Sequence, residues 1–101
     1  MLYIRQLIWK QSLIDKMISK HGVWPDEVED VIFNNRPYGN LIGKVANTNE
    51  RRYKVLGKTT KGRYLAIILG KRERSGDATP ITAWDMDNKD RRLYRNKLGK
   101  R

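Results

Sequence analysis

The sequence predicts an α+β fold, with a small, mostly antiparallel sheet of about four strands, two helices before it and one after it. Two observations predict this class. Apolar residues recur at helical spacing between residues 12 and 32, whereas residues 51–86 contain the short alternating or continuous apolar runs of strands. The 101 residues, 39% of them hydrophobic, are enough to form one core. We therefore expect a single domain over residues 1–101.

The N-terminal third predicts one strand and two helices. Residues 2–9, rich in aromatic and β-branched residues, are expected to form a strand. A helix over residues 12–20 would be capped by Ser12 and would end at Gly22, which can adopt the positive φ of a C-cap. Pro25 suits the first turn of a second helix. The buried face of that second helix would consist of Val28, Val31 and Ile32.

Three further segments predict the rest of the sheet. Residues 34–50 are rich in Asn and Gly, which indicates a loop or a weakly paired strand. Residues 51–59 alternate as a strand does, and residues 63–70 form the nearly continuous apolar run of a central strand. Residues 71–80 predict a polar hairpin connection, which leads to a last strand at residues 81–86.

A final helix is expected near the C-terminus, with Asp85 or Asp87 as its cap. The residues expected to face inward are Met86, Leu93 and Tyr94. The residues expected to point largely outward are Lys89, Arg91, Arg92 and Arg95. This helix would therefore present a basic surface.

The charge of the chain is concentrated in its second half. Residues 51–101 carry sixteen basic and five acidic groups, whereas residues 1–50 carry six of each, so the second half holds the whole net charge of +11. Such asymmetry favours a polyanionic partner, with nucleic acid first and an anionic membrane second. A surface that only confers solubility is the alternative. On the first interpretation, these cations gather in a single groove.

Composition excludes several kinds of site. The chain has no cysteine and one histidine, so disulfides, thiolate zinc sites and His-rich metal sites are excluded, and only an oxygen-ligated metal remains possible. The leading interpretation expects no metal and no cofactor. Arg5 and Gln6 interrupt the N-terminal apolar stretch that a signal peptide needs. No run approaches the roughly 18 apolar residues of a membrane span. A cytoplasmic protein with no membrane partner is the resulting expectation.

Basic and aromatic residues of the predicted sheet and last helix are the candidates for nucleic-acid contact. Lys and Arg bind phosphates without reading sequence, and exposed aromatic rings stack on unpaired bases. Lys54 and Lys58 share strand parity with Arg52, which predicts one common face. The basic set is Arg51, Arg52, Lys54, Lys58, Arg63, Arg91, Arg92 and Arg95, and the aromatic set is Tyr38, Tyr53, Tyr64 and Trp84. For Tyr53 and Tyr64, a place in the sheet core is the favoured interpretation.

Catalysis on RNA is a further hypothesis. Metal-free cleavage needs a base for the 2′-hydroxyl, cations at the phosphate and an acid for the leaving oxygen. Arg and Lys would supply the cations. His21, Tyr94 or a Lys with a lowered pKa would transfer the proton. No serine triad, phosphate-binding loop or dinucleotide-binding loop is present in the sequence.

Three stretches of the chain resemble the BrnT-type toxins, small ribonucleases of bacterial toxin–antitoxin pairs with a fold related to RelE. They are "KHGV…DEVEDVIF", "RYKVLGKTTKGRYLAIIL" and "ITAWDMDNKDRRLYRN". The resemblance covers nearly the whole chain apart from an insertion near residues 36–50. It implies a RelE-like sheet with two N-terminal helices and one C-terminal helix, metal-free RNA cleavage that halts translation, and neutralisation by a small DNA-binding antitoxin.

The resemblance also implies site residues. Those implied are Lys20, His21, Arg63, Arg91, Arg92 and Tyr94. Family members usually place an arginine after "ITA", where this chain has Trp84, which favours binding over cutting unless Arg92 or Lys58 replaces that cation. In the family the "KHG" triplet closes the first helix. We therefore interpret His21 first as a helix end, with the essential base as the alternative.

The leading hypothesis is a cytoplasmic, RelE-like ribonuclease toxin. Its expected catalytic residues are Arg63, Arg92, Lys58, His21 and Tyr94, and its expected RNA-binding residues are Lys20, Lys54, Trp84, Arg91 and Arg95. RNA and a cognate antitoxin are the expected partners, with a dimer possible inside the toxin–antitoxin complex. The alternatives are a non-catalytic nucleic-acid-binding relative and a basic protein-interaction domain.

Overall fold

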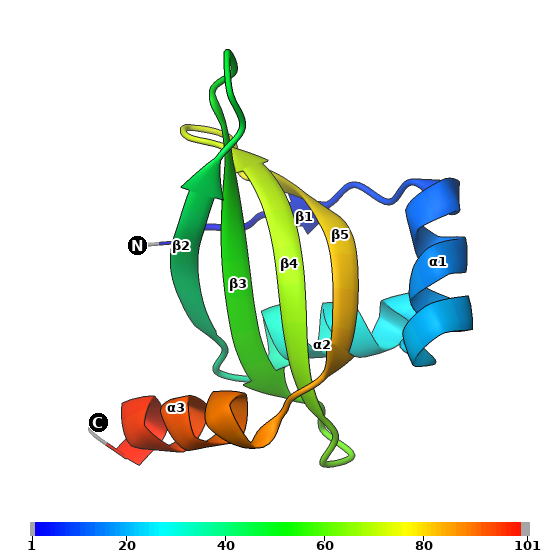
Figure 1. The fold of residues 1–101 in the computed structure, drawn as a ribbon, viewed down its shortest axis with the longest axis vertical. Coiled ribbons are helices and arrows are strands. Elements are labelled where there is room, and N and C mark those ends of the chain that lie inside the picture. The colour runs from blue at the N-terminus through cyan, green and yellow to red at the C-terminus, as the bar shows by residue number, and fades with distance from the viewer. Residues whose placement is uncertain (1, 100–101) are drawn as a thin grey trace.

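A five-stranded sheet with helices against both of its faces is the architecture of residues 2–99, the part of the chain that the computed structural model describes (Figure 1). The fold class is therefore α+β, as predicted. The elements in chain order are β1 (Gln6–Leu7), α1 (Gln11–His21), α2 (Pro25–Asn34), β2 (Tyr38–Lys44), β3 (Glu50–Lys58), β4 (Tyr64–Arg72), β5 (Asp77–Asp85) and α3 (Asn88–Gly99).

The sheet is mixed, with the order β1-β5-β4-β3-β2. Strands β2 to β5 form an antiparallel meander, and only the short β1 runs parallel to its neighbour β5. The two central strands, β3 and β4, pair over their full length from Glu50↔Arg72 to Lys58↔Tyr64. This long, regular pairing provides the rigid surface on which the helices and the candidate site are placed.

The expected strand over residues 2–9 is wrong for most of its length, because only Gln6 and Leu7 pair with another strand. The apolar residues of this segment are used for packing instead, as Leu2, Ile4 and Trp9 lie against the core. The aromatic and β-branched composition of this segment therefore did not predict its pairing correctly, and Tyr3 and Ile8 are exposed.

Residues 34–50, predicted as a loop or weakly paired strand, contain the full edge strand β2, so the sheet has five strands rather than about four. Its sequence has few buried side chains because β2 lies at the edge, where Leu41 and Ile42 are 48% and 52% exposed. The connection expected over residues 71–80 is also shorter, because β4 continues to Arg72 and β5 begins at Asp77.

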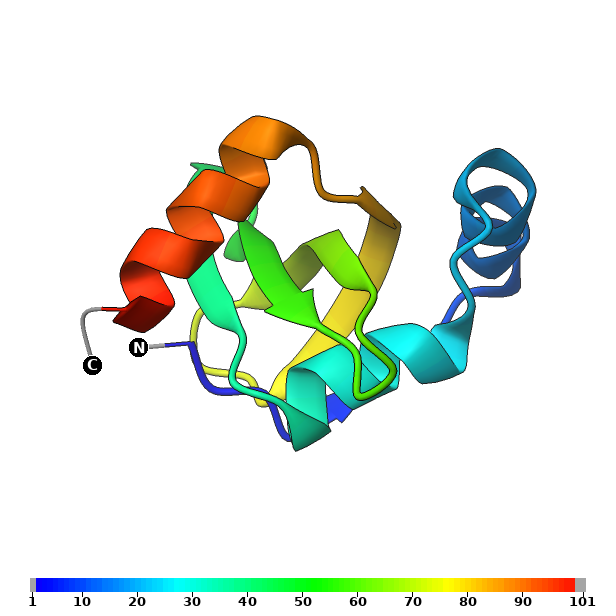
Figure 2. The same cartoon turned by 90° about the horizontal axis from the view of Figure 1, so that it is seen from below.

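Helices α2 and α3 lie on opposite faces of the sheet, as the view from below shows (Figure 2). We call the side that carries α3 the front face and the side that carries α2 the back face. The larger core fills the back, and its members are Leu7, Met17, Val23, Val28, Val31, Ile32, Val55, Leu65, Ile67, Leu69, Ala78 and Ala83. The smaller core lies in front, and its buried members are Leu56, Ala66, Met86 and Tyr94.

The helix ends follow the predicted chemistry in most respects. Gly22 caps α1 in the left-handed conformation with φ of 62°, and Pro25 opens α2. Ser12 is not the N-cap of α1, because the helix begins at Gln11 and Lys10 precedes it without a side-chain cap bond. At α3, the side chain of Asp87 accepts a hydrogen bond from the backbone N–H of Asp90, as expected of a cap.

Leu93 does not face inward, because its side chain is 39% exposed. The face of α3 that meets the sheet carries Asp90, Tyr94 and Leu98, which are spaced four residues apart. Leu93 lies one position off that stripe. No helix among residues 2–99 is both long enough and apolar enough to cross a lipid bilayer.

Candidate nucleic-acid interface

Three cations of β3 lie on the front face of the sheet. Arg52, Lys54 and Lys58 alternate with the buried Val55 and Gly57, so they share one side of the strand. On that side, Lys54 lies over the ring of Trp84 on β5 and Lys58 over the ring of Tyr64 on β4. The predicted common face is therefore present. In Figure 1 this face points toward the viewer, and α3 crosses only its lower end.

Lys54 is held at the middle of the front face by two neighbours. Its ammonium donates a hydrogen bond to Oδ1 of Asp90, at 2.9 Å, and lies 5.8 Å from the centre of the Trp84 ring. Asp90 itself is only 6% exposed, and its Oδ2 accepts no hydrogen bond from residues 2–99. A buried carboxylate is unfavourable without a partner charge, so its pairing with Lys54 holds that cation in place. Lys54 is thus positioned, with part of its charge still facing solvent.

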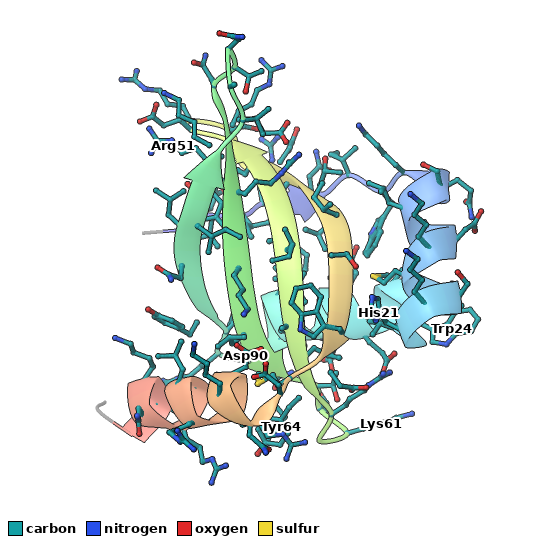
Figure 3. All side chains as sticks on the ribbon, in the orientation of Figure 1. His21, Trp24, Arg51, Lys61, Tyr64 and Asp90 are labelled. Carbon is teal, nitrogen blue, oxygen red and sulfur yellow. The ribbon has the colours of Figure 1, made fainter. Side chains whose placement is uncertain are left out.

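His21 reaches the same region from the end of α1. Its ring centre lies 6.3 Å from that of Trp84, and the two ring planes are tilted by 51°. Figure 3 shows His21 on the side of α1 that faces β5, while Asp90 points to the sheet from α3. The structure therefore brings together three predicted residues, His21, Lys54 and Trp84, from three separate elements.

A second cationic group surrounds Tyr64 at the lower end of the front face. The ammonium of Lys58 lies 5.6 Å from the ring centre of Tyr64, and the guanidinium of Arg91 lies 4.7 Å from it. Tyr94, which is 4% exposed, meets the same ring edge-on at 6.1 Å. Tyr64 therefore packs against the front core, as favoured above, and it orders two cations at the surface.

Arg63 connects four segments of the chain. Its guanidinium donates to Asp85 at 2.7 Å, to Glu27 at 3.0 Å, and to the main-chain carbonyls of Gly22 and His21 at 2.9 and 3.3 Å. The hydrogen bond to Asp85 is the main reason why the pKa of Arg63 is raised above its ordinary value. The same hydrogen bond from Arg63 lowers the pKa of Asp85. Arg63, predicted as a phosphate binder, is fully engaged with protein groups.

The remaining predicted cations lie apart from Trp84. Arg92 and Arg95 are exposed on α3 and line a hollow of about 310 Å³ together with Asn88 and Asn96. Lys20 is exposed in the last turn of α1. The cations of the second half therefore form separate groups on the front face, on the outer side of α3 and at the hairpin end of the sheet, rather than the single groove that we expected.

Three acidic residues that organise the site were not predicted. Asp90 positions Lys54, while Glu27 and Asp85 hold Arg63. The sequence gives no local signal for these contacts, because the partners are 36, 36 and 22 residues apart. A carboxylate amid a basic helix, as in "NKDRR", is the one hint that the sequence offers for Asp90.

No protein-family profile matches this chain, and a search of curated proteins finds no significant match.

Proposed function

We propose that this chain is an RNA-binding, metal-independent endoribonuclease of the RelE-like type, related to the BrnT toxins that its sequence resembles. The observation that carries the proposal is the meeting of His21, Lys54 and Trp84 on the front face. A proton-transfer group and a cation are two of the groups that metal-free RNA cleavage needs, and a flat aromatic ring beside them can stack an unpaired base.

In the proposed reaction, the 2′-oxygen of a ribose attacks the adjacent phosphorus and the bond to the 5′-oxygen breaks. A cyclic phosphate and a free 5′-hydroxyl are the products. The imidazole of His21 takes the proton of the 2′-hydroxyl, and a solvent water supplies the proton that the leaving 5′-oxygen gains. Lys54 and Lys58 stabilise the charge that develops on the phosphate oxygens. Trp84 stacks the neighbouring base and so orients the ribose.

Arg63 has a positioning role in this proposal. Because its guanidinium holds the carbonyls of His21 and Gly22, it fixes the end of α1 relative to the sheet. The imidazole of His21 is thereby kept beside Trp84. The expected phosphate contact passes instead to Lys54, Lys58 and Arg91, whose charged groups lie over rings at the surface of the front face.

The partners follow from the same surface. RNA is the substrate, and an antitoxin that covers the front face is the proposed regulator, with a dimer inside that complex. The work of such a toxin takes place in the cytoplasm, where its RNA targets are. These statements rest on the resemblance and on the basic front face together.

A non-catalytic nucleic-acid-binding relative is the second candidate. It is favoured by Trp84 at the position where the resembling family has an arginine, and by the complete engagement of Arg63. Without those two guanidinium groups near the phosphate, binding would persist while transition-state stabilisation would fall.

The two candidates are separated by incubating the purified protein with a labelled single-stranded RNA in EDTA. The ribonuclease proposal expects cleavage products with cyclic phosphate ends, and a His21→Gln variant that binds RNA but cleaves at least 100-fold more slowly, as loss of an acid–base group does. Arg36→Gln, which removes an exposed cation after α2, is the matched control. Tight binding with no cleavage by the unaltered protein would establish the second candidate instead.

A further inference from the structure

Two hairpin turns close the end of the sheet opposite α3 (Figure 1). One joins β2 to β3 and the other joins β4 to β5, and both rise above the sheet. They border two adjoining hollows of about 440 and 400 Å³. The first hollow is lined by Lys44, Asn47, Thr48, Asn49 and Arg72, and the second by Asn49, Arg72, Glu73, Arg74 and Ser75.

The acidic groups of this end are already neutralised. Glu73 pairs with Arg51 at 3.1 Å, and Glu50 pairs with Arg52. Within residues 2–99, Lys44, Arg72 and Arg74 form no ion pair, and all three side chains are exposed. The hairpin end therefore presents unpaired cations beside amide and hydroxyl groups, which is the donor set that binds phosphate.

The hairpin loops are held in a defined shape. The hydroxyl of Thr48 donates to the carbonyl of Val45 at 2.9 Å and accepts from the backbone N–H of Glu50 at 3.0 Å. Asn47 adopts φ of 62°, the left-handed conformation that asparagine tolerates. In the β4–β5 turn, which carries Arg74, the backbone N–H of Ser75 donates to the carbonyl of Arg72 at 3.1 Å, and the backbone N–H of Asp77 donates to the hydroxyl of Ser75 at 3.0 Å.

Arg72 of the hairpin end lies on the same side of the sheet as the cations of the front face, although the two groups are separate. Arg72 is the register partner of Glu50, and these two residues share the parity of Arg52 and Lys54 on that side of the sheet. Lys54 and Glu50 are four positions apart on β3, a distance of roughly 13 Å along a strand. A chain of phosphates that passes Trp84 and Lys54 can therefore reach Arg72 without leaving the surface.

We propose that the hairpin end is a second phosphate-binding subsite, in which Arg72 and Arg74 hold the backbone of the same single-stranded RNA that occupies the front face. The inference rests on the proposed function and adds to it the direction and length of the bound strand. RNA is favoured over an acidic protein segment because the path leads directly to the stacking ring of Trp84. The strand lies along β3, from α3 toward the hairpins.

The test compares labelled RNA oligonucleotides of 4 and 12 nucleotides, which bracket the site sizes of about 4 to 16 that single-strand-binding surfaces show. Arg72→Gln/Arg74→Gln is compared with Arg36→Gln/Lys61→Gln, which removes the same charge from exposed positions at the other end of the sheet. Figure 3 shows Lys61 at that far end, in the β3–β4 turn. Affinity is measured by fluorescence anisotropy over a range of salt concentrations.

The proposal expects the hairpin variant to bind the 12-mer roughly tenfold more weakly, with a salt slope smaller by about 1.4, since each phosphate contact on a single strand contributes about 0.7. Binding of the 4-mer should stay unchanged, and the control pair should bind both RNAs nearly as the unaltered protein does.

Equal losses for the two double variants, or no loss for either, would overturn the subsite while leaving the front face in place. Loss of 12-mer binding in a Lys54→Ala protein would then still support the proposed function. If the unaltered protein bound neither oligonucleotide, both proposals would fall. Polyglutamate of equal charge is also tested as a competitor. If it displaced the labelled 12-mer as effectively as unlabelled RNA does, the hairpin end would be assigned to an acidic protein segment instead.

Discussion

The ammonium of Lys54 lies 2.9 Å from the carboxylate of Asp90 and thereby joins the middle of the sheet to the first turn of α3. The two residues differ in exposure: the side chain of Lys54 is 31% exposed, whereas that of Asp90 is only 8% exposed. The pair therefore has two effects. It docks α3, and it fixes a cation beside Trp84.

Replacing Asp90 with alanine should destabilise the fold by about 1 to 3 kcal/mol, because a charge-assisted hydrogen bond is lost and α3 is released from β3. Urea unfolding of D90A, of Lys54→Ala and of the double variant measures the coupling between them. We expect a coupling energy of about 1 kcal/mol or more. Strictly additive losses would show that the ion pair contributes nothing to docking.

Replacing Arg63 with alanine should cost about 2 to 4 kcal/mol, because Glu27 and Asp85 lose their shared partner and two carbonyls lose a donor. Arg63→Lys should rescue little, since an ammonium cannot reach four acceptors in the planar geometry of a guanidinium.

The position of His21 provides a readout specific to the end of α1. We expect the imidazole resonances of His21 to shift in Arg63→Ala and to keep their place in Arg36→Ala. An unshifted His21 in an otherwise folded Arg63→Ala protein would contradict the positioning role.

Stability should fall in acid through the aspartates whose pKa values are lowered in the folded state. The pKa of Asp30 is lowered chiefly by the backbone N–H of Thr60, and that of Asp85 by Arg63. A lowered folded pKa means that the stabilisation is complete above the ordinary aspartate pKa of about 3.9 and is lost as pH falls through the folded value. Melting temperatures between pH 7 and pH 2 should show this loss, with a shallower acid limb for Asp85→Asn. An identical acid limb in that variant would assign the loss to other groups.

Trp84 should contribute through stacking, so Trp84→Ala should weaken RNA binding by about 1 to 3 kcal/mol while Trp84→Phe retains most of the affinity. The phenylalanine variant also controls for packing, because Trp84 lies against the front core. Anisotropy with a labelled single-stranded RNA measures both. Equal RNA affinity of the alanine and phenylalanine variants would show that Trp84 does not bind RNA by base stacking.

Replacing Gly22 with alanine should cost about 1 kcal/mol, because φ of 62° is strained for alanine. No neighbouring atom lies within 4 Å of the added methyl group, so the cost would come from the backbone alone. Urea unfolding checks this value. A destabilisation as large as that of Arg63→Ala would instead indicate that the whole end of α1 had moved.

The parts of the fold that could be predicted are those that depend on the local backbone preference of a single residue. Gly22 and Pro25 mark the end of α1 and the start of α2 because their backbone preferences are local. The edge strand β2 was hard to predict, because an edge strand buries few side chains and so lacks an apolar pattern. Its pairing with β3 depends on the tertiary fold.

The candidate site was predicted in its residue types but not in its connections. Lys54, Trp84 and His21 were all expected to contact RNA, and the structure places them together. Arg63 was expected at the phosphate, yet its partners Glu27 and Asp85 come from α2 and β5, and no spacing in the sequence relates them. Such long-range ion pairs can be identified only from the tertiary structure.

The exposed edge of β2 has a consequence for the behaviour of the protein in concentrated solution. Leu41 and Ile42 project from a strand whose outer backbone groups are available to another chain, and such edges promote intermolecular sheet formation. Mutual repulsion between molecules of charge +11 opposes that association. Because the screening length shrinks to about 3 Å in 1 M salt, self-association should rise steeply with ionic strength. The same surplus of charge that we propose to bind RNA thus keeps the molecules dispersed.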